Sequence, residues 1–219
     1  MAPRSIGLDE ALQAYVAAHS SPPDEIQCAL IERTEALGSV SGMQIAPEQG
    51  EFLTMLTELV GARFAVEVGT FTGYSALAIA RGLAPGGRLL CCDVSHEWTS
   101  IAREHWELAG VADRIDLRVA PAIETLRALP SDVEVDLAFI DADKPGYVDY
   151  YEELLARLSP TGVMCVDNTL WSGAVIDDEV TDESTVAIRR FNDHVAADER
   201  TRQVMLPIGD GLTMVRRVR

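Results

Sequence analysis

The spacing of apolar residues changes near residue 63, and this change divides the chain into two regions. Before it, apolar side chains recur at the period of an amphipathic helix, as they do at Leu8, Leu12, Tyr15 and Val16. Asp24 can cap a second helix that runs to Leu37, and Pro47 lies in the first turn of a third over residues 47–60, with a loop at 38–47 between them. Residues 1–60 are therefore predicted to form an N-terminal helical segment.

After residue 63, short runs rich in β-forming residues alternate with helical patterns. The predicted strands cover residues 64–68, 88–92, 114–119, 135–140 and 162–167, and the helices that follow them cover 73–83, 96–109, 121–129, 146–158 and 185–197. Such alternation indicates a parallel sheet with helices on both faces. Two further runs, 202–208 and 212–218, are separated by three residues, which is the spacing of an antiparallel hairpin. We predict a single α/β domain over 1–219 whose core, 61–219, is Rossmann-like.

The chain carries a large excess of acidic residues, which narrows its range of partners. Its 219 residues include 18 Lys and Arg against 35 Asp and Glu, a formal net charge of −17. Such a field repels phosphate backbones and anionic lipids but not a divalent cation or a cationic cofactor, so nucleic acid and membranes are not expected as partners. The clustered arginines that could contact RNA are Arg189, Arg190, Arg216, Arg217 and Arg219.

Neither a membrane span nor a disulfide framework is visible in the sequence. No apolar run approaches the ~20 residues that cross a bilayer, the N-terminus has no apolar signal core, and the four cysteines lack metal-site spacing. Unpatterned cysteines are typical of a reducing compartment, so we predict a cytoplasmic protein.

A turn with two glycines follows the first predicted strand, in the sequence EVGTFTGYS at residues 67–75. Glycines here let the backbone approach a ligand, but the GxxxG spacing lacks the middle glycine that admits the pyrophosphate of a dinucleotide. Glu67 would repel a phosphate and suits a ligand with a positive centre. Asp93, which ends the second strand, can accept hydrogen bonds from both hydroxyls of a ribose. These features favour a cationic nucleoside, and S-adenosylmethionine fits that description.

Acidic and amide side chains follow the fourth and fifth predicted strands. Asp141 follows one, and Asp167 and Asn168 follow the other. If the two strands are neighbours, about 4.8 Å apart, these side chains meet at one edge of the sheet. Their oxygens suit Mg²⁺ or Ca²⁺ better than zinc, and three protein ligands leave positions for substrate. A pocket filled by a salt bridge to a protein side chain would rule this metal site out. Lys144 could accept a proton there, because a nearby dication disfavours its ammonium form.

Each of these residues also has a structural interpretation. An aspartate at the end of a strand is often a helix cap, and a lysine at the start of a helix is often solvent-exposed. Trp171 and Ser172, in TLWSG, could form a wall of the acceptor site, although a single Trp is equally typical of a core. Met43 and Ile45, which precede the third helix, could cover a ligand or belong to an ordinary loop.

The chain resembles the cation-dependent class I O-methyltransferases, a family that includes caffeoyl-CoA and catechol O-methyltransferases and their bacterial relatives. The matching strings are EVGTFTGYS, CCDVS, APAIETL, FIDADK, DNTLWSG and LPIGDG, in family order within residues 43–217. The resemblance implies a seven-stranded doubly wound sheet with an antiparallel last strand, and a homodimer. It implies Mg²⁺, or Ca²⁺ or Mn²⁺ in the same site, on Asp141, Asp167 and Asn168.

The resemblance also assigns the remaining site residues. It implies that S-adenosylmethionine contacts Met43, Ile45, Glu67, Gly69, Thr70, Ser75, Asp93, Ala122, Asp141 and Asp143. Lys144 and Asp141 are the expected catalytic residues, and the acceptor is expected near Met43, Lys144, Trp171 and Ser172.

The sequence thus predicts a metal-dependent O-methyltransferase that acts on an aromatic small molecule with vicinal hydroxyls. The plant enzymes of this family have a basic N-terminal region and a longer insertion after the DNTLW motif, both of which serve the CoA ester. Residues 1–42 and 173–185 are acidic here, which favours a free catechol-like acceptor over a CoA thioester. The alternatives are a tRNA hydroxyuridine methyltransferase of the same fold, a nicotinamide dehydrogenase and a non-catalytic cofactor-binding module.

Overall fold

A seven-stranded sheet forms the centre of the molecule in the computed structural model, which describes residues 7–218. The strands are β1 (Phe64–Val68), β2 (Arg88–Asp93), β3 (Ile115–Val119), β4 (Val135–Ile140), β5 (Leu158–Val166), β6 (Thr201–Leu206) and β7 (Leu212–Arg217). The α-helices are α1 (Glu10–Ala18), α2 (Glu25–Glu35), α3 (Pro47–Val60), α4 (Tyr74–Gly82), α5 (His96–Leu108), α6 (Ala122–Ala128), α7 (Tyr147–Arg157) and α8 (Glu183–Ala197). Short 3₁₀ helices are η1 (Gly38–Met43), η2 (Ala112–Arg114), η3 (Lys144–Gly146) and η4 (Trp171–Ile176).

The strand order is β3-β2-β1-β4-β5-β7-β6, and it confirms the predicted Rossmann-like topology. Strands β1 to β5 pair in parallel, whereas β7 runs antiparallel to both β5 and β6. The order reverses between β1 and β4, and open α/β sheets bind ligands outside the carboxyl ends of the strands at such a reversal.

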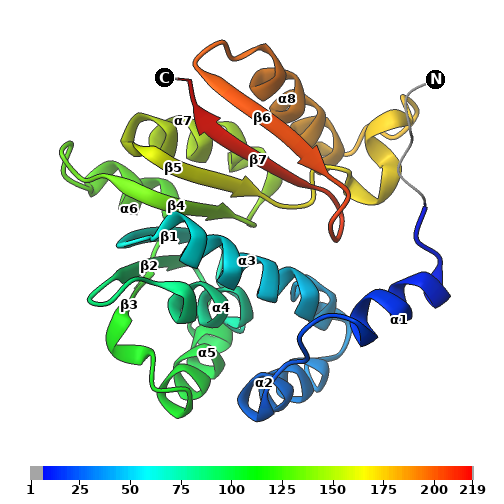
Figure 1. Cartoon of the computed structure of the whole chain (residues 1–219). Helices are drawn as coiled ribbons and strands as arrows, with labels where there is room; N and C mark the ends of the chain where they lie inside the picture. Colours follow the sequence, from blue (N-terminus) through cyan, green and yellow to red (C-terminus); the bar gives the residue numbers. More distant parts are fainter. Residues whose placement is uncertain (1–6, 219) are drawn as a thin grey trace.

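Both faces of the sheet are covered by helices, as Figure 1 shows. Alternate strand residues such as Ala65 and Phe139 pack with α2, α3, α4 and α5, and the intervening ones such as Val66 and Ile140 pack with α6, α7 and α8. Because both faces are buried, β1 and β4 are almost wholly apolar, as is typical of central parallel strands. The result is two hydrophobic cores on either side of one sheet.

The N-terminal helices form where the sequence predicted them. Asp24 caps α2 and exchanges hydrogen bonds with Gln27 in a capping box, and Pro47 is the first residue of α3. The predicted loop at 38–47 contains the 3₁₀ helix η1. Helix α1 has no buried residue, so its apolar stripe faces outward.

One boundary differs clearly from the sequence prediction. Strand β5 begins at Leu158, directly after α7, and not at residue 162. Its pairing with β4 is irregular between Val135 and Leu137, because Leu158 pairs with Val135 while Val163 pairs with Leu137. This bulge lengthens the strand through Pro160 and Gly162, which as a sequence resemble a turn. Within the described residues, no helix combines the length and apolar character needed to cross a membrane.

Candidate functional site

A cavity of about 840 Å³ opens at the carboxyl ends of the parallel strands. Its size is within the range of small-molecule sites. Of the predicted site residues, its wall contains Met43, Ile45, Gly69, Thr70, Ser75, Asp93, Ala122, Asp141, Asp143, Lys144, Asp167, Asn168 and Trp171. Glu67 and Ser172 do not line it. The fold therefore brings together, at the strand reversal, residues that span more than half of the chain.

The glycines of the first loop are required by packing as well as by any ligand. Gly69 has a φ of +89°, and a Cβ on it would collide with the main-chain carbonyl of Asp141. Gly73, at φ +84°, lies against α5, where Trp106 donates a hydrogen bond of 3.0 Å to its carbonyl oxygen. The loop is thus fixed between β4 and α5 by contacts of its own backbone.

Asp93 binds this loop through main-chain groups. Its Oδ2 accepts hydrogen bonds from the backbone N–H groups of Thr70 (2.9 Å) and Phe71 (2.8 Å), and its Oδ1 accepts one from Ser95 (2.8 Å). A carboxylate offers about four lone-pair directions, so Asp93 retains capacity to accept a hydrogen bond from a ligand in the cavity. It orders the loop and faces the cavity at the same time.

Glu67 lies beneath the loop and not in the cavity wall. It follows Ala65 by two residues, and alternate strand residues share a face, so its side chain points toward α4. The side chain is fully buried, and neither carboxylate oxygen has a hydrogen-bond partner among the described residues. Burial raises the pKa of Glu67 to about 7, although the nearby Ser75, Thr70 and Cys91 side chains partly oppose the rise.

The three predicted metal ligands meet in one cluster. Ile140 and Val166 are paired in the β4–β5 ladder, so Asp141 and Asp167 follow at the same edge. Asn168 has a φ of +57°, and its backbone N–H donates a hydrogen bond of 2.7 Å to Asp167 Oδ1. The neighbouring strands therefore place two carboxylates and one amide side by side, as the sequence predicted.

Lys144 lies in the middle of this cluster and is buried. Its Nζ donates to Asn168 Oδ1 (2.6 Å), to the Tyr147 hydroxyl (2.6 Å) and to Asp141 Oδ1 (3.2 Å). This is the kind of salt bridge that counts against a metal at these acids. The bridge is partial, however, because Lys144 makes no contact with the carboxylate of Asp167 in the hydrogen-bond pattern of the described residues.

The electrostatics of the cluster leave room for a further positive charge. Burial raises the pKa of Asp141, an effect that Lys144 opposes. Burial and the neighbouring Asp141 raise the pKa of Asp167 to about 7. Both shifts indicate that two carboxylates facing one ammonium are undercompensated when ionised. The hard oxygen donors and this excess negative charge fit a divalent cation of the magnesium type.

Several residues of the site escaped the sequence analysis. Gln49, on the first turn of α3, is buried and donates a hydrogen bond of 2.7 Å to Asp167 Oδ2. Tyr147 is fully buried, and its hydroxyl accepts a hydrogen bond from Lys144 Nζ. Trp98 lines the cavity beside Phe71, with ring centroids 5.1 Å apart. The available sequence signal for Gln49 was that it is a polar residue on the core-facing side of a helix.

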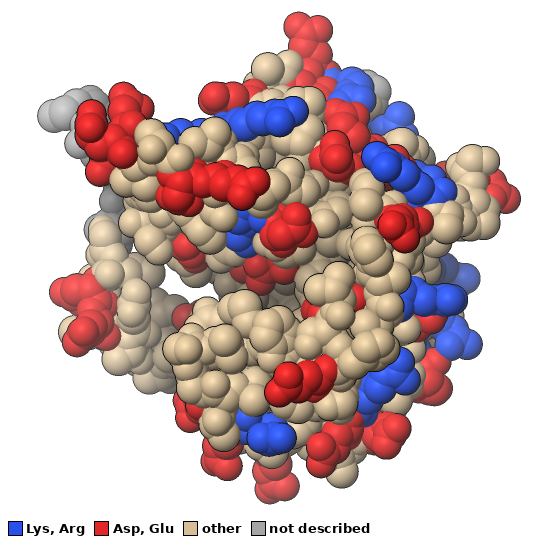
Figure 2. Space-filling model, turned by 180° about the vertical axis from the view of Figure 1, so that it is seen from behind, with Lys and Arg blue, Asp and Glu red and all other residues tan. Residues whose placement is uncertain are grey.

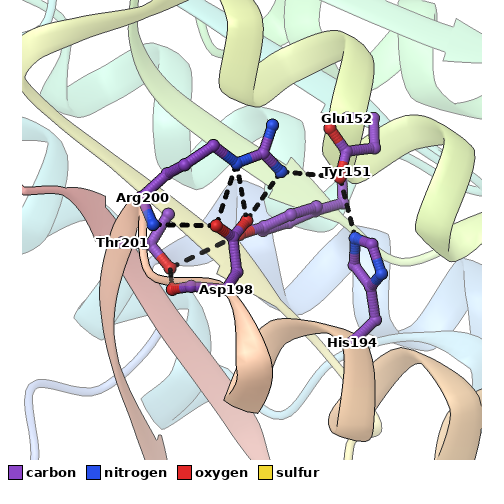
Figure 3. A network of polar contacts seen from close by, with 6 residues as sticks. All are labelled: Tyr151, Glu152, His194, Asp198, Arg200 and Thr201. Atoms are coloured by element: carbon purple, nitrogen blue, oxygen red, sulfur yellow. Dashed lines mark hydrogen bonds and ion pairs between the residues drawn. The ribbon is translucent and has the colours of Figure 1, made fainter.

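A second acidic cluster lies away from the cavity, where α7, α8 and the start of β6 meet (Figure 3). Glu152, His194 and Asp198 have ligand atoms within 4.8 Å of one another. Arg200 already supplies a cation there, since its Nη2 lies 2.7 Å from both Glu152 Oε1 and Asp198 Oδ2. The Tyr151 hydroxyl also donates to Asp198 (2.8 Å). This network joins three elements and is satisfied without a metal.

Comparison with known proteins agrees with the geometry of the cavity. The sequence pattern of the O-methyltransferase family matches residues 17–218. A probable caffeoyl-CoA O-methyltransferase 1 from Dictyostelium discoideum is 38% identical over 208 residues, which cover 93% of this chain and 90% of that protein.

Two solved structures are similar over nearly their whole length. The O-methyltransferase from Bacillus cereus, in complex with SAH, has a TM-score of 0.87 and 32% identity, covering 95% of this chain and 97% of that one. TomG from Streptomyces achromogenes, in complex with SAM, has a TM-score of 0.86 and 27% identity, covering 95% and 96%. The chain belongs to the O-methyltransferase family and is an S-adenosylmethionine-dependent O-methyltransferase of the caffeoyl-CoA O-methyltransferase type.

Proposed function

We propose that this protein transfers the methyl group of S-adenosylmethionine to one hydroxyl of a catechol-like acceptor and that it depends on a divalent cation. The observation that supports this most strongly is the convergence of Asp141, Asp167, Asn168 and Lys144 in the wall of the cavity that also contains the Gly69 loop. Methyl donor and acceptor must meet within one site, and both groups of residues line this one cavity.

Asp141, Asp167 and Asn168 would hold the cation, with Mg²⁺ as the expected ion. When bound, such an ion would act as a Lewis acid that lowers the pKa of the acceptor hydroxyl. It would bind oxygens of Asp141 and Asn168, the residues to which Lys144 donates hydrogen bonds. Gln49 fixes one oxygen of Asp167, and the Asn168 N–H fixes the other. These hydrogen bonds orient the carboxylate and limit its rotation.

Lys144 is placed to receive the proton of the acceptor hydroxyl. Tyr147, fully buried, accepts a hydrogen bond from Nζ and donates one of 3.2 Å to the carbonyl oxygen of Asp167. Nζ is thereby held at the edge of the cavity, the position that proton transfer from a bound acceptor hydroxyl requires. The acceptor oxygen then forms a bond to the methyl carbon, the carbon–sulfur bond breaks, and the electron pair stays on sulfur to give S-adenosylhomocysteine.

A free aromatic acceptor is favoured over a CoA ester by charge. Several acidic residues lie in the segment after Trp171, among them Asp177, Asp178 and Glu179, and all three are exposed. In the view of Figure 2, Lys and Arg are interspersed with Asp and Glu and form no continuous basic patch on that face. A polyanionic CoA moiety would meet unfavourable charge there.

The same distribution disfavours the tRNA alternative. Arg189, one of the arginines that could contact RNA, donates its hydrogen bonds to main-chain carbonyls of the segment 174–180. It is therefore engaged within the fold. Binding of RNA depends on arginine and lysine side chains that are free to contact phosphates.

We further propose a homodimer in the cytoplasm. Leu8, just before α1, and Leu12, Tyr15 and Val16 within it are each more than a third exposed, and a second copy could cover this apolar stripe. Cys28, Cys91, Cys92 and Cys165 are free thiols, as is typical of a reducing compartment. Light scattering of the purified chain measures its oligomeric state directly, and a monomer at micromolar concentration would refute the homodimer.

Turnover with labelled methyl donor tests the central proposal. The assay compares free catechols with caffeoyl-CoA, each with Mg²⁺ and with excess chelator. We expect methylation of free catechols only with the cation, and loss of that activity in Asp141→Asn, while calorimetry shows retained binding of S-adenosylmethionine. Asp132→Asn, at an exposed position, is the matched control. Full activity of Asp141→Asn in chelator would refute the metal assignment, and exclusive turnover of caffeoyl-CoA would refute the choice of acceptor.

A further inference from the structure

The segment after Asn168 has an unusual backbone. Trp171, Ser172 and Gly173 have φ values of +47°, +51° and +82°, so two residues with side chains occupy the left-handed region in succession. Such conformations persist where the surroundings determine them, and they concentrate at ligand sites. Trp171 lines the cavity, and its ring centroid lies 5.3 Å from Lys144 Nζ. The segment therefore forms the wall beside the proposed proton acceptor.

The turn between β6 and β7 holds this segment from one side. The backbone N–H of Ser172 donates to Asp210 Oδ1 (2.6 Å), and that of Leu170 donates to the Asp210 carbonyl oxygen (2.9 Å). The N–H of Thr169 donates to the Gly211 carbonyl oxygen (2.9 Å). A Cβ on Gly211, whose φ is +88°, would lie 2.6 Å from the Leu170 nitrogen, so the turn is shaped to receive the segment.

Helix α8 holds the same segment from the other side. The guanidinium of Arg189 donates to the carbonyl oxygens of Ala174 (2.7 Å), Val175 (3.1 Å) and Val180 (2.9 Å), and also to that of Asp177. Arg189 forms no ion pair among the described residues, so its donors serve the main chain. One rigid, planar side chain with five N–H donors can organise several carbonyls in this way, which a lysine cannot.

We propose, building on the function proposed above, that Asp210 is a positioning residue for the acceptor: its carboxylate fixes the Ser172 N–H and thereby the left-handed turn that sets Trp171 at the cavity wall. Arg189 anchors the distal half of the same segment. Asp210 also lines the cavity, but its Oδ1 is engaged by the Ser172 N–H, through which it acts on Trp171; neither Asp210 nor Arg189 belongs to the cluster around Asp167. The donor side, held by Asp93 and the Gly69 loop, does not depend on this contact.

The variants Asp210→Ala and Asp210→Asn test whether Asp210 positions the segment through its hydrogen bond to the Ser172 N–H, because only the Asn side chain keeps an oxygen that can accept it. Removing the acceptor of one charge-assisted hydrogen bond is expected to raise the KM for the aromatic acceptor about tenfold. The KM for S-adenosylmethionine should stay within about twofold, since the donor site is intact. The Asn variant should restore most of the loss, because its amide oxygen can still accept from the Ser172 N–H. Asp132→Ala serves as the control for loss of an exposed carboxylate.

Amide hydrogen exchange of the peptide covering residues 169–180 gives a readout that does not require turnover. It should be protected in the wild type and in Asp210→Asn, and should exchange faster in Asp210→Ala. Arg189→Lys, as a second variant, should raise exchange in its 174–180 half. Unchanged exchange in Asp210→Ala, or equal increases in both KM values, would overturn the proposal. If the wild type methylates no catechol, the acceptor assignment fails, whereas exchange still decides whether Asp210 orders the segment.

Discussion

Glu67 offers a quantitative test of the electrostatics beneath the cofactor loop. Its side chain is fully buried, and its oxygens have no hydrogen-bond partner among the described residues. Burial raises its pKa from 4.5 to about 7. The substitution Glu67→Gln keeps the shape and removes the ionisable group. The Thr70 and Ser75 hydroxyls beside it can accept from the new amide, which makes the substitution tolerable.

The sign of the effect follows from proton binding. Between pH 4.5 and about 7 the native chain holds the Glu67 proton while the unfolded chain has released it, so stability falls as the pH rises through this interval. At a pH where Glu67 is ionised in both the native and the unfolded chain, this difference in pKa destabilises the native state by about 3 kcal/mol. Glu67→Gln lacks this penalty. Its advantage over the wild type should therefore grow by roughly 2 kcal/mol between about pH 5 and pH 8.

Urea unfolding without cofactor, at about pH 5 and pH 8, measures this difference. The raised pKa values of Asp141 and Asp167 affect both proteins equally and cancel in the comparison. Glu134→Gln, at an exposed position, should give parallel pH profiles with the wild type. We also expect Glu67→Gln to bind S-adenosylmethionine more weakly, because a costly buried carboxyl near a cationic ligand is typical of a functional site. Parallel profiles for Glu67→Gln and the wild type would refute the reasoning.

Three further predictions concern other parts of the fold. Gly69→Ala should lower the free energy of unfolding by more than about 2 kcal/mol, because its Cβ collides with a main-chain carbonyl; Gly86→Ala, with a similar φ of +77° but open space around it, should lose less. Arg200→Gln should lower stability by roughly 1–2 kcal/mol near neutral pH. The pKa of its partner Asp198 is lowered, so the stability lost on substitution should be at its full size above about pH 5 and should diminish as the pH falls below 3.8. Unfolding measured along an acid titration checks this pH dependence. Gln49→Ala, which frees a proposed ligand carboxylate, should weaken binding of Mn²⁺ about tenfold by calorimetry, and unchanged affinity would contradict its orienting role.

The elements were predictable because local pattern and tertiary position agree in this chain. The mostly apolar runs 64–68 and 135–140 coincide with the bounds of β1 and β4, since strands buried on both faces are largely apolar. Asp24 and Pro47 mark the starts of α2 and α3 through chemistry that acts within one turn. The start of β5 was missed because its bulge depends on pairing with Val135, which is a tertiary contact.

The candidate site was predictable only where it follows strand ends. Asp141, Asp167 and Asn168 could be placed together because parallel strands end at one edge. Gln49, by contrast, reaches Asp167 from a helix 118 positions earlier in the chain. Lys144 was expected to act as a base, but its contact with Asn168 Oδ1 depends on the positive φ at Asn168, which no local pattern reveals. Glu67 was expected to contact S-adenosylmethionine, and the alternation of the strand places its side chain behind the loop, outside the cavity lining.

The two halves of the cavity are built by different means, and this difference bears on specificity. On the donor side, Asp93 holds backbone N–H groups and Gly69 abuts a backbone carbonyl, so nearly any substitution there disturbs the loop itself. On the proposed acceptor side, side chains of Asp210 and Arg189 hold the segment through its backbone N–H and carbonyl groups. A change of side chain at residues 174–180 would leave both anchors with their main-chain partners. The proposed acceptor wall can therefore change without altering the site of the methyl donor, because its anchors hold it through its backbone.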